Sequence, residues 1–346
     1  MLILVTGGAG YIGNVLVPRL LARGHEVRVL DRMFWGLPSY ADEPGVELVN
    51  ADVRRIPEGV LDGIDAVDHL SGFSNDPTAE YSPEANWQMN AVATETIAKL
   101  CRASGVRRLV FGSSCSLYDG VDRGEELLDE GAELHPRGAY ATSKRYSEEA
   151  LMAFAGGGFE PVVLRQATVF GASPRMRFDL VVNAFVKDAL VRQRLILHGG
   201  GRMWRPLVNV NDLAEAHIAC LEAPAEAVAG ETFNVVGENY QVRELAEVVA
   251  AALVKLGKPV ALEDGPLPNI VRNYRCTGAK LRERLGITCP TTPAQAVQEL
   301  VEIYGKAPIE QLGHPRFYNI AWMELLETVR PAYQAMQNIF EPVDEG

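Results

Sequence analysis

The sequence predicts an α/β protein built on a doubly wound parallel sheet, with a smaller, mostly helical part towards the C-terminus. In the first half of the chain, short and uniformly apolar runs alternate with stretches of helical length, a pattern typical of strands covered on both faces. The first run leads into a glycine-rich turn, TGGAGYIG at 6–13, that opens a helix. After about residue 172 the alternation loosens, which indicates a second substructure.

The expected elements follow the apolar pattern in order. Five runs rich in β-forming residues are expected to be strands of the parallel sheet: 3–6, 27–31, 46–52, 66–70 and 108–114. Helices are expected at 11–24, at 83–105 and from about 140, and a further strand over 161–171.

The second half is less regular. A loop entering a helix is expected at 173–190, and a glycine turn, a strand and a helix over 199–223. The remaining predictions are a strand at 231–237, helices at 242–256, 278–285 and 293–304, and a Pro/Gly/Asp-rich loop at 257–269. The tail after Gly305 contains the amphipathic NIAWMELLETV (319–329), which either packs as a helix on the domain or a partner subunit, or contributes to a ligand site.

Composition excludes several classes of protein. The 346 residues carry a net charge of −12, which argues against a nucleic-acid surface and requires local basic groups for any anionic ligand. The five cysteines are odd in number and form no C-x-x-C pair, so we expect free thiols and neither disulfides nor a metal site. No signal peptide and no membrane-length apolar run is recognised, and a cytoplasmic protein is expected.

The glycine turn predicts a Rossmann-type dinucleotide site. Gly7 permits the tight turn, Gly10 lets the backbone approach a diphosphate, and Gly13 lets the helix pack closely on the strand. Asp31, at the end of the second strand, could accept hydrogen bonds from both ribose hydroxyls and would repel a 2′-phosphate. NAD is therefore expected rather than NADP, although Arg32 follows directly.

A second motif points to redox chemistry. In GAYATSKRYSEE (138–149), Tyr140 lies four residues before Lys144, one helical turn away. A nearby ammonium group favours phenolate and should lower the pKa of Tyr140, so that it can take a proton from a substrate hydroxyl. Ser114, in GSSCSLY (112–118), ends the fifth predicted strand, where ligands of parallel sheets bind, and could share that proton.

At this point the chain resembles the extended short-chain dehydrogenase/reductase family, in particular its nucleotide-sugar epimerases and dehydratases. The resemblance covers about residues 1–305 and depends on motifs in the family's order: TGGAGYIG, Asp31, the AD at 51–52, HLSG at 69–72, Asn90, SSCSLY, YATSK, LRQATVFG at 164–171 and WRPLVNVNDLA at 204–214.

The resemblance implies roles for particular residues. It implies that Ser114, Tyr140 and Lys144 are catalytic. Contacts to NAD are implied for Gly7, Gly10, Tyr11, Ile12, Gly13, Asp31, Arg32, Asp52, Val53, Leu70, Asn90, Tyr140 and Lys144. Contacts to a nucleoside diphosphate sugar are implied for Ser116, Thr168, Arg177, Asn183, Arg205 and Arg272, whereas Arg175 is taken as a solvated surface group.

The resemblance also implies an organisation. Residues 1–172, with 207–236 returning to them, are expected to bind NAD, and residues 173–206 and 237–346 to bind the nucleotide sugar. A homodimer is expected through the helices at about 84–104 and 140–155.

The reaction class depends on the residues after Ser114. Family members that eliminate water resemble a form with an Asp–Glu pair here, whereas this chain has Cys115 and Ser116, which are poor substitutes for a carboxylic acid. The expected function is therefore NAD-dependent epimerisation, at C4, through a keto sugar. A 4-ketoreductase, or a dehydratase using Asp76 as its acid, remains an alternative, and so does a non-catalytic NAD-binding scaffold. Cys115 is expected to pack behind the strand, with a covalent or acid role as the alternative.

Four positions depart from the family's pattern, and they leave the sugar and the nucleotide open. Thr168 stands where relatives carry Asn, Asn209 replaces His, Ala93 replaces Gly, and Asp119 replaces Gly.

Overall fold

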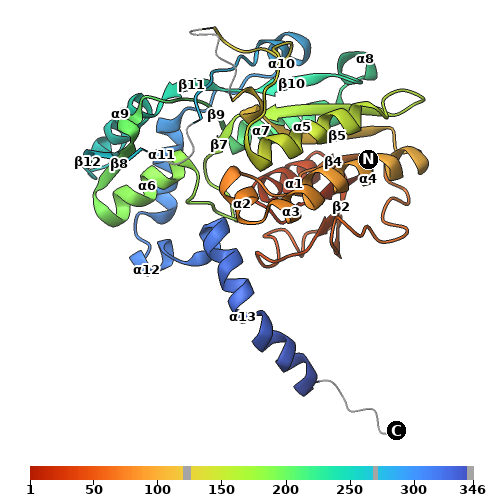
Figure 1. Ribbon diagram of the computed structural model, residues 1–346, viewed down its shortest axis with the longest axis horizontal. Coiled ribbons are helices and arrows are strands. Elements are labelled where there is room, and N and C mark those ends of the chain that lie inside the picture. The colour runs from red at the N-terminus through yellow and green to blue at the C-terminus, as the bar shows by residue number, and fades with distance from the viewer. Residues whose placement is uncertain (120–125, 268–271, 341–346) are drawn as a thin grey trace.

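A seven-stranded parallel sheet forms the centre of the protein (Figure 1). The computed structural model describes residues 1–119, 126–267 and 272–340. The strands of this sheet are β1 (Leu2–Thr6), β2 (Glu26–Asp31), β3 (Val46–Asn50), β4 (Ala66–His69), β5 (Arg108–Ser114), β6 (Glu160–Gln166) and β10 (Thr232–Val235). Their order, β10-β6-β5-β4-β1-β2-β3, reverses direction between β1 and β4, so the predicted doubly wound parallel sheet is confirmed.

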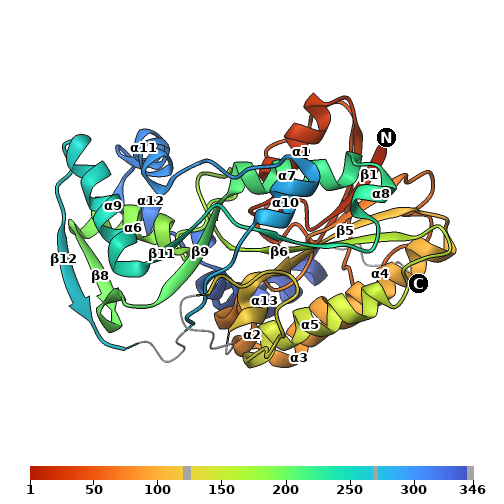
Figure 2. The same ribbon diagram turned by 90° about the horizontal axis from the view of Figure 1, so that it is seen from above.

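Helices cover both faces of this sheet (Figure 2). One face carries α1 (Gly13–Ala22), α7 (Val210–Glu222), α8 (Ala225–Val228) and α10 (Ala279–Leu285). The other carries α2 (Asp76–Tyr81), α3 (Pro83–Asn86), the π-helical η1 (Trp87–Val92), α4 (Ala93–Ala103) and α5 (Gly138–Met152). The helix predicted over 83–105 thus consists of three consecutive helical segments, α3, η1 and α4.

The side chains of β1 point alternately to the two faces of the sheet and belong to two different apolar clusters. Ile3 and Val5 belong to the apolar cluster under α1 and α7, whereas Leu4 belongs to the cluster under α4. Successive side chains of a strand point to opposite faces, so a uniformly apolar strand is buried on both. This is the physical basis of the sequence pattern that predicted the sheet.

A smaller part lies beside the sheet and has its own apolar core. Its elements are α6 (Val181–Arg192), β8 (Arg194–His198), η3 (Gly199–Gly201), α9 (Val242–Lys255), β12 (Ala261–Gly265), α11 (Pro293–Tyr304), α12 (Ile309–Leu312) and η4 (Pro315–Phe317). Val182, Leu195, Val249 and Val297 bring α6, β8, α9 and α11 together in one cluster. The predicted smaller, mostly helical part is thus present; its division from the first part at residue 172, with 207–236 returning, stays a prediction.

Two local predictions were wrong. The predicted loop at 257–269 contains β12, which pairs in parallel with β8, Leu262 lying opposite Leu195. The predicted strand over 161–171 is two strands, because after β6 the chain leaves the large sheet. It continues as β7 (Thr168–Phe170), which pairs with β9 (Trp204–Asn209) and through it with β11 (Glu238–Gln241). Both differences come from pairing with distant segments.

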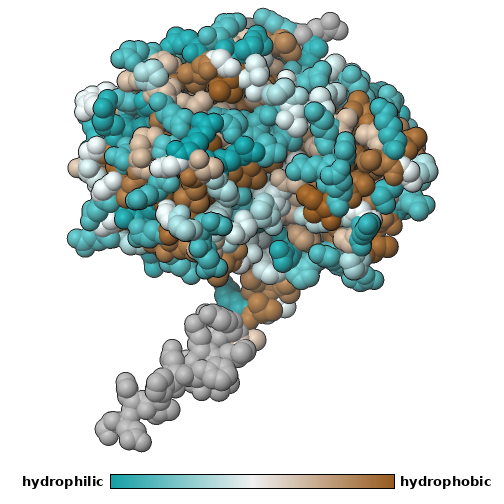
Figure 3. Space-filling view, turned by 180° about the vertical axis from the view of Figure 1, so that it is seen from behind, coloured by the Kyte–Doolittle hydropathy of each residue, from teal (hydrophilic) through white to brown (hydrophobic). Residues whose placement is uncertain are grey.

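The tail forms a long helix, α13 (Asn319–Phe340), which runs away from the body of the protein (Figure 1). The amphipathic segment predicted at 319–329 is its first half, and the last six residues of the tail, 341–346, lie outside the described residues. Seen from behind, the body shows hydrophobic residues in separate patches among hydrophilic ones, with one patch where α13 leaves it (Figure 3). Within the described residues, no helix is long and apolar enough to cross a membrane.

Candidate active site

A cleft of ≈ 670 Å³ opens at the carboxyl ends of the parallel strands. Its lining includes residues at or just beyond the ends of five strands: Gly7, Asp31, Leu70, Ser114 and Gln166. Ligands of open α/β sheets bind at this edge, next to the point where the strand order reverses. The predicted site residues in its lining are Gly7, Gly10, Tyr11, Ile12, Gly13, Asp31, Arg32, Val53, Leu70, Ser114, Ser116, Tyr140, Lys144, Thr168, Arg177 and Arg272. Asp52, Asn90, Asn183 and Arg205 are not in it.

The glycine turn leaves no room for side chains. Gly7 has a φ of +75°, and a Cβ there would lie 2.7 Å from the amide nitrogen of Ser71. A Cβ on Gly13 would lie 2.1 Å from the carbonyl oxygen of Gly8, so α1 can pack this closely only with glycine. The start of α1 lines the cleft, and such a helix N-terminus favours a diphosphate.

Asp31 is oriented for a ribose. Its two carboxylate oxygens accept from the amides of Ala9 at 3.1 Å and Met33 at 2.9 Å, and burial raises its pKa. A carboxylate oxygen has two acceptor sites, so each oxygen keeps one for a ligand hydroxyl. The glycine turn and Asp31 together fit the adenosine and diphosphate of a dinucleotide.

Asp52 is occupied by other partners. Its carboxylate contacts Arg32 at 2.8 Å and Arg54 at 2.6 Å, and these bonds hold its pKa far below the usual value. Its neighbours Ala51 and Val53, rather than Asp52 itself, line the cleft.

The predicted catalytic residues meet on the floor of the cleft. Tyr140 lies in the first turn of α5, is buried, and shares a hydrogen bond with Ser114 at the end of β5. Lys144, one turn later, donates from Nζ to the carbonyl of Gly112 at 2.8 Å and lies 4.6 Å from the centre of the Phe111 ring.

The expected direction of one pKa was wrong for this structure. Burial raises the pKa of Tyr140 to about 12, and the bond with Ser114 only partly offsets that rise. Burial also lowers the pKa of Lys144 to about 8. Lys144 is not among the main influences on the pKa of the phenol, since its ammonium group is directed at Gly112 and the face of Phe111.

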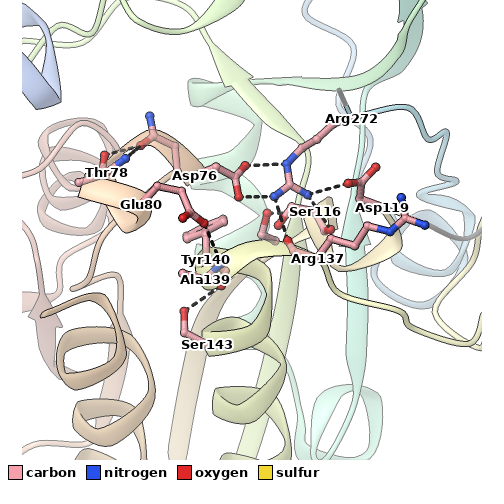
Figure 4. Close-up of polar contacts among 12 residues, drawn as sticks. Asp76, Thr78, Glu80, Ser116, Asp119, Arg137, Ala139, Tyr140, Ser143 and Arg272 are labelled. Atoms are coloured by element: carbon pink, nitrogen blue, oxygen red, sulfur yellow. Dashed lines mark hydrogen bonds and ion pairs between the residues drawn. The ribbon is translucent and has the colours of Figure 1, made fainter. Parts of the chain in front are cut away.

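Arg272 and Asp76 form an ion pair in the cleft wall (Figure 4). Arg272 Nε donates to Asp76 Oδ2 at 2.6 Å, Nη2 bonds the other carboxylate oxygen, and Asp119 lies 3.5 Å away. Arg272 also donates to the carbonyl of Ser116 at 3.2 Å. The Ser116 hydroxyl is buried and has no hydrogen-bond partner among the residues described.

The other predicted substrate residues separate into two groups. Arg177 lines the cleft and contacts Asp179 at 2.8 Å and Ser74 at 3.0 Å. Asn183 lies behind it and accepts from the amide of Gly171 at 3.0 Å. Arg205 donates to the backbone carbonyls of Trp204 and Arg272, and thus lies behind Arg272.

Asn90 also lies behind the cleft wall. Its side chain makes two hydrogen bonds to the backbone of Phe73, at 2.8 and 3.1 Å, and a Cβ on Gly72 would overlap its amide oxygen. Asn90 therefore holds the loop after β4 in place. Its predicted contact with NAD stays a prediction.

Arg175 is a cleft residue that the sequence analysis missed. The sequence predicts a solvated surface group, but Arg175 is only 9% exposed and lines the cleft. Its guanidinium lies 3.6 Å from the centre of the Trp35 ring and donates to Asn319 at 2.7 Å. Its Nε and Nη1 have no partner within the described part of the chain, and burial lowers its pKa to about 9. The pattern PRMRF, two arginines near a predicted loop, was the available signal.

The tail contributes to the cleft as well. Trp322, in the first turns of α13, donates from its indole to the carbonyl of Phe34 at 2.7 Å and stacks on Trp35 at 6.1 Å. Glu327 accepts from the Tyr81 hydroxyl at 2.6 Å. The lining residues from α13 are Asn319, Trp322, Met323, Leu326, Glu327 and Arg330. The first half of α13 thus forms a wall of the cleft, and its contribution to a ligand site stays a prediction.

Cys115 packs behind the strand, as expected. It is fully buried, does not line the cleft, and donates to the carbonyl of Arg165 at 3.1 Å.

These features define a dinucleotide-dependent enzyme of the short-chain dehydrogenase type: a glycine turn with an acidic ribose partner, and a Ser, Tyr and Lys set on the same cleft floor. The chain belongs to the NAD dependent epimerase/dehydratase family, whose model matches residues 3–236. The predicted family, the NAD dependence and the enzymatic class are thereby confirmed.

Relatives with assigned names are distant but consistent. The chain is 29% identical over 282 residues to a UDP-glucose 4-epimerase of Corynebacterium glutamicum, covering 77% of this chain and 84% of the relative. It is 29% identical over 229 residues to a UDP-glucuronic acid decarboxylase 1 of Xenopus tropicalis, covering 64% of this chain and 53% of the relative. The chain thus spans about half the length of that decarboxylase.

Solved structures agree on the fold. An NAD-dependent NDP-hexosamine 5,6-dehydratase, TunA, has a TM-score of 0.77 at 25% identity, covering 89% of this chain and 99% of that one. A dTDP-glucose 4,6-dehydratase of Streptomyces venezuelae, DesIV, has a TM-score of 0.76 at 26% identity, covering 88% and 98%. A UDP-glucose 4-epimerase of Thermotoga maritima has a TM-score of 0.78 at 23% identity, covering 88% and 99%, and shows the fold alone.

Proposed function

We propose that this protein is an NAD-dependent epimerase of a nucleoside diphosphate sugar, acting at C4 through a keto sugar. The observation that carries the proposal is the convergence of Ser114, Tyr140 and Lys144 on the floor of the cleft, with no carboxylate beside Ser114 on β5 or η2 (Cys115–Tyr118). This set can oxidise a carbinol and reduce the resulting ketone, but the strand end offers no acid for elimination.

The glycine turn, from Gly7 to Gly13, and Asp31 would hold the diphosphate and a ribose of NAD. Bound NAD supplies a reversible two-electron acceptor. Tyr140 takes the proton from the sugar hydroxyl and later returns it, with Ser114 as its hydrogen-bond partner. The positive charge of a bound nicotinamide ring would favour the phenolate, and Lys144 would hold the nicotinamide ribose.

The substrate's diphosphate needs cations, because the protein as a whole is acidic, with a net charge of −12. Arg175 is the strongest candidate, since two of its guanidinium nitrogens are buried without a protein partner in the described chain. Arg177 and Arg272 also line the cleft, but each is already bonded to a carboxylate. Ser116 and Thr168, both in the lining, would contact the sugar. The predicted ligand contacts of Asp52, Asn90, Asn183 and Arg205 would be indirect.

Dehydration is the second candidate function, since Asp76 is a carboxylate in the cleft lining and similar structures carry dehydratase names. Both of its carboxylate oxygens are already bonded to Arg272, however, and neither is directed at a ligand alone. A 4-ketoreductase would use the same Ser, Tyr and Lys set but would consume its reductant.

We also propose a homodimer and a cytoplasmic location. The dimer would form on α3, η1, α4 and α5, where the partly exposed rings of Trp87 on η1 and Tyr146 on α5 lie 4.9 Å apart. The location is inferred from the five cysteines, all free thiols.

The test is proton NMR of the purified protein with NAD and a panel of nucleotide sugars: UDP-glucose, UDP-glucuronate and their C4 epimers. A new anomeric signal without net NADH supports epimerisation. Tyr140→Phe is the matched control and should bind NAD yet lose the new signal. Loss of water from the sugar would favour dehydration, and no change with any sugar would refute C4 epimerisation of this panel.

A further inference from the structure

A buried carboxylate lies in the middle of the central sheet. Asp68 is in β4, in register with Val5 on β1 and Val110 on β5, and it is fully buried. One of its oxygens has no hydrogen-bond partner within the described residues. Burying an incompletely paired carboxylate is unfavourable, which suggests that Asp68 has a role that compensates for this cost.

The other oxygen of Asp68 leads to the cleft through a histidine. Asp68 Oδ2 lies 2.8 Å from Nδ1 of His217, which is on α7 and fully buried. Nε2 of the same ring lies 3.0 Å from the amide nitrogen of Gln166, at the end of β6. Three groups from β4, α7 and β6 thus form one chain of hydrogen bonds.

The chemistry of the donors decides the direction of these bonds. An amide NH₂ can only donate, so Nε2 of His217 must accept, and the ring proton must lie on Nδ1. Nδ1–H then donates to Asp68. By holding the proton on Nδ1, the carboxylate also makes Nε2, the other ring nitrogen, a hydrogen-bond acceptor.

The fixed histidine in turn fixes the amide of Gln166. With its nitrogen bound to His217, the amide presents its oxygen as the free end. Gln166 lies opposite Ser114 in the β5–β6 register and lines the cleft. Its oxygen has no protein partner in the part of the chain that the structure describes.

Gly112 makes this arrangement possible. A Cβ at Gly112 would lie 2.7 Å from the amide nitrogen of Gln166, so only glycine leaves space for that side chain. The carbonyl of Gly112 accepts the ammonium of Lys144 at 2.8 Å. The chain of hydrogen bonds therefore ends next to the groups assigned to the chemistry.

We propose that Asp68 and His217 are positioning residues that hold the Gln166 amide oxygen in the cleft as an acceptor for a neutral N–H or O–H donor of the bound ligands. The inference rests on the proposed use of the cleft for NAD and a nucleotide sugar. Two donors share this chemistry: the carboxamide of nicotinamide and a sugar hydroxyl. A ligand with an acceptor at this point would be disfavoured, because a flipped amide would set its oxygen against the lone pair of His217.

The test uses two substitutions and one matched control in the full-length protein. Gln166→Met removes the amide at similar length, and Asp68→Asn removes the charge that fixes the tautomer. Glu160→Gln is the control. Glu160 is also a buried carboxylate of this sheet, but it pairs with Arg108 at the amino ends of β5 and β6, away from the cleft. Calorimetry measures the Kd of NAD, and then of UDP-glucose and UDP-glucuronate with NAD present.

We expect Gln166→Met to weaken one ligand by roughly tenfold, the effect of one lost hydrogen bond. Asp68→Asn should weaken the same ligand, and Glu160→Gln should leave both affinities within about twofold. A loss for NAD identifies the carboxamide as the donor, and a loss confined to the sugar identifies the hydroxyl. ¹⁵N NMR of histidine-labelled protein should show the ring proton of His217 on Nδ1.

Two results would overturn the proposal: unchanged affinities in Gln166→Met, or a His217 proton on Nε2 at neutral pH. If Asp68→Asn fails to fold, Gln166→Met and the NMR signal still decide. NAD binding and the tautomer are measured without turnover, so failure of the proposed epimerase activity would be distinguishable from failure of this proposal.

Discussion

Lys144 should make the free energy of unfolding depend on pH in a specific way. Burial lowers its pKa from the ordinary 10.5 to about 8. Above pH 10.5 the amine is neutral in both the folded and the unfolded chain. As the pH falls from there through 8, the unfolded chain is already protonated, while the folded protein must place a charge at a buried site. The folded state therefore loses stability over this range.

The size of the loss follows from the shift in pKa. One pKa unit corresponds to 1.36 kcal/mol, so the wild-type protein should lose about 3 kcal/mol relative to Lys144→Met between pH 10.5 and pH 7. At neutral pH the variant should be the more stable protein although it lacks an active-site residue, as expected where function needs a buried charge.

Urea unfolding followed by tryptophan fluorescence at pH 7, 8, 9 and 10 measures the effect. The quantity of interest is the difference between wild type and variant, because other titrations then cancel. Lys144→Gln, a second neutral variant, should show the same pH dependence despite different packing. A difference that stays constant from pH 7 to pH 10 would refute the argument that burial controls this lysine.

Three further substitutions test the cleft. Ser114→Ala removes the hydrogen bond that lowers the pKa of Tyr140, so that pKa should rise and kcat/KM at pH 7 should fall roughly tenfold for each unit of rise; an unchanged pH–rate profile would contradict this. Gly13→Ala places a Cβ 2.1 Å from the carbonyl oxygen of Gly8, so NAD binding measured by calorimetry should weaken at least ~10-fold, and wild-type affinity would show that the turn is not the NAD site. Trp322→Ala removes the stack on Trp35, so NAD should dissociate roughly tenfold faster in stopped-flow fluorescence; an unchanged rate would mean that α13 does not cover NAD.

Much of the fold was predictable because its signals are local. The strands of the central sheet are short, mainly apolar runs. The glycines of the turn stand where a Cβ would clash with nearby atoms. The strand β12 was missed because ALEDG is polar and short, and it becomes a strand only by pairing with β8.

The part of the candidate site that could be predicted consists of residues whose chemical type and position in a motif indicate their role. The Tyr140 and Lys144 pair, Ser114 and Asp31 all lie in the cleft, because strand ends and the first turn of a helix are positions that the chain pattern specifies. Arg175 was misjudged because burial of an arginine depends on Trp35 and Asn319, which are distant in sequence.

Sequence by itself therefore determined the class of fold, the family and the catalytic residue types, since these depend on periodicity and short motifs. Tertiary structure alone decided which charges are free and which are paired. Arg272 is bonded to Asp76, 196 residues away, whereas Arg175 keeps two free guanidinium nitrogens within the described chain. The tertiary structure also buries Tyr140 and Lys144, which raises the pKa of Tyr140 and lowers that of Lys144. The physical reason is that desolvation and hydrogen bonding act through space, so the electrostatics of the cleft arise from segments that only folding brings together.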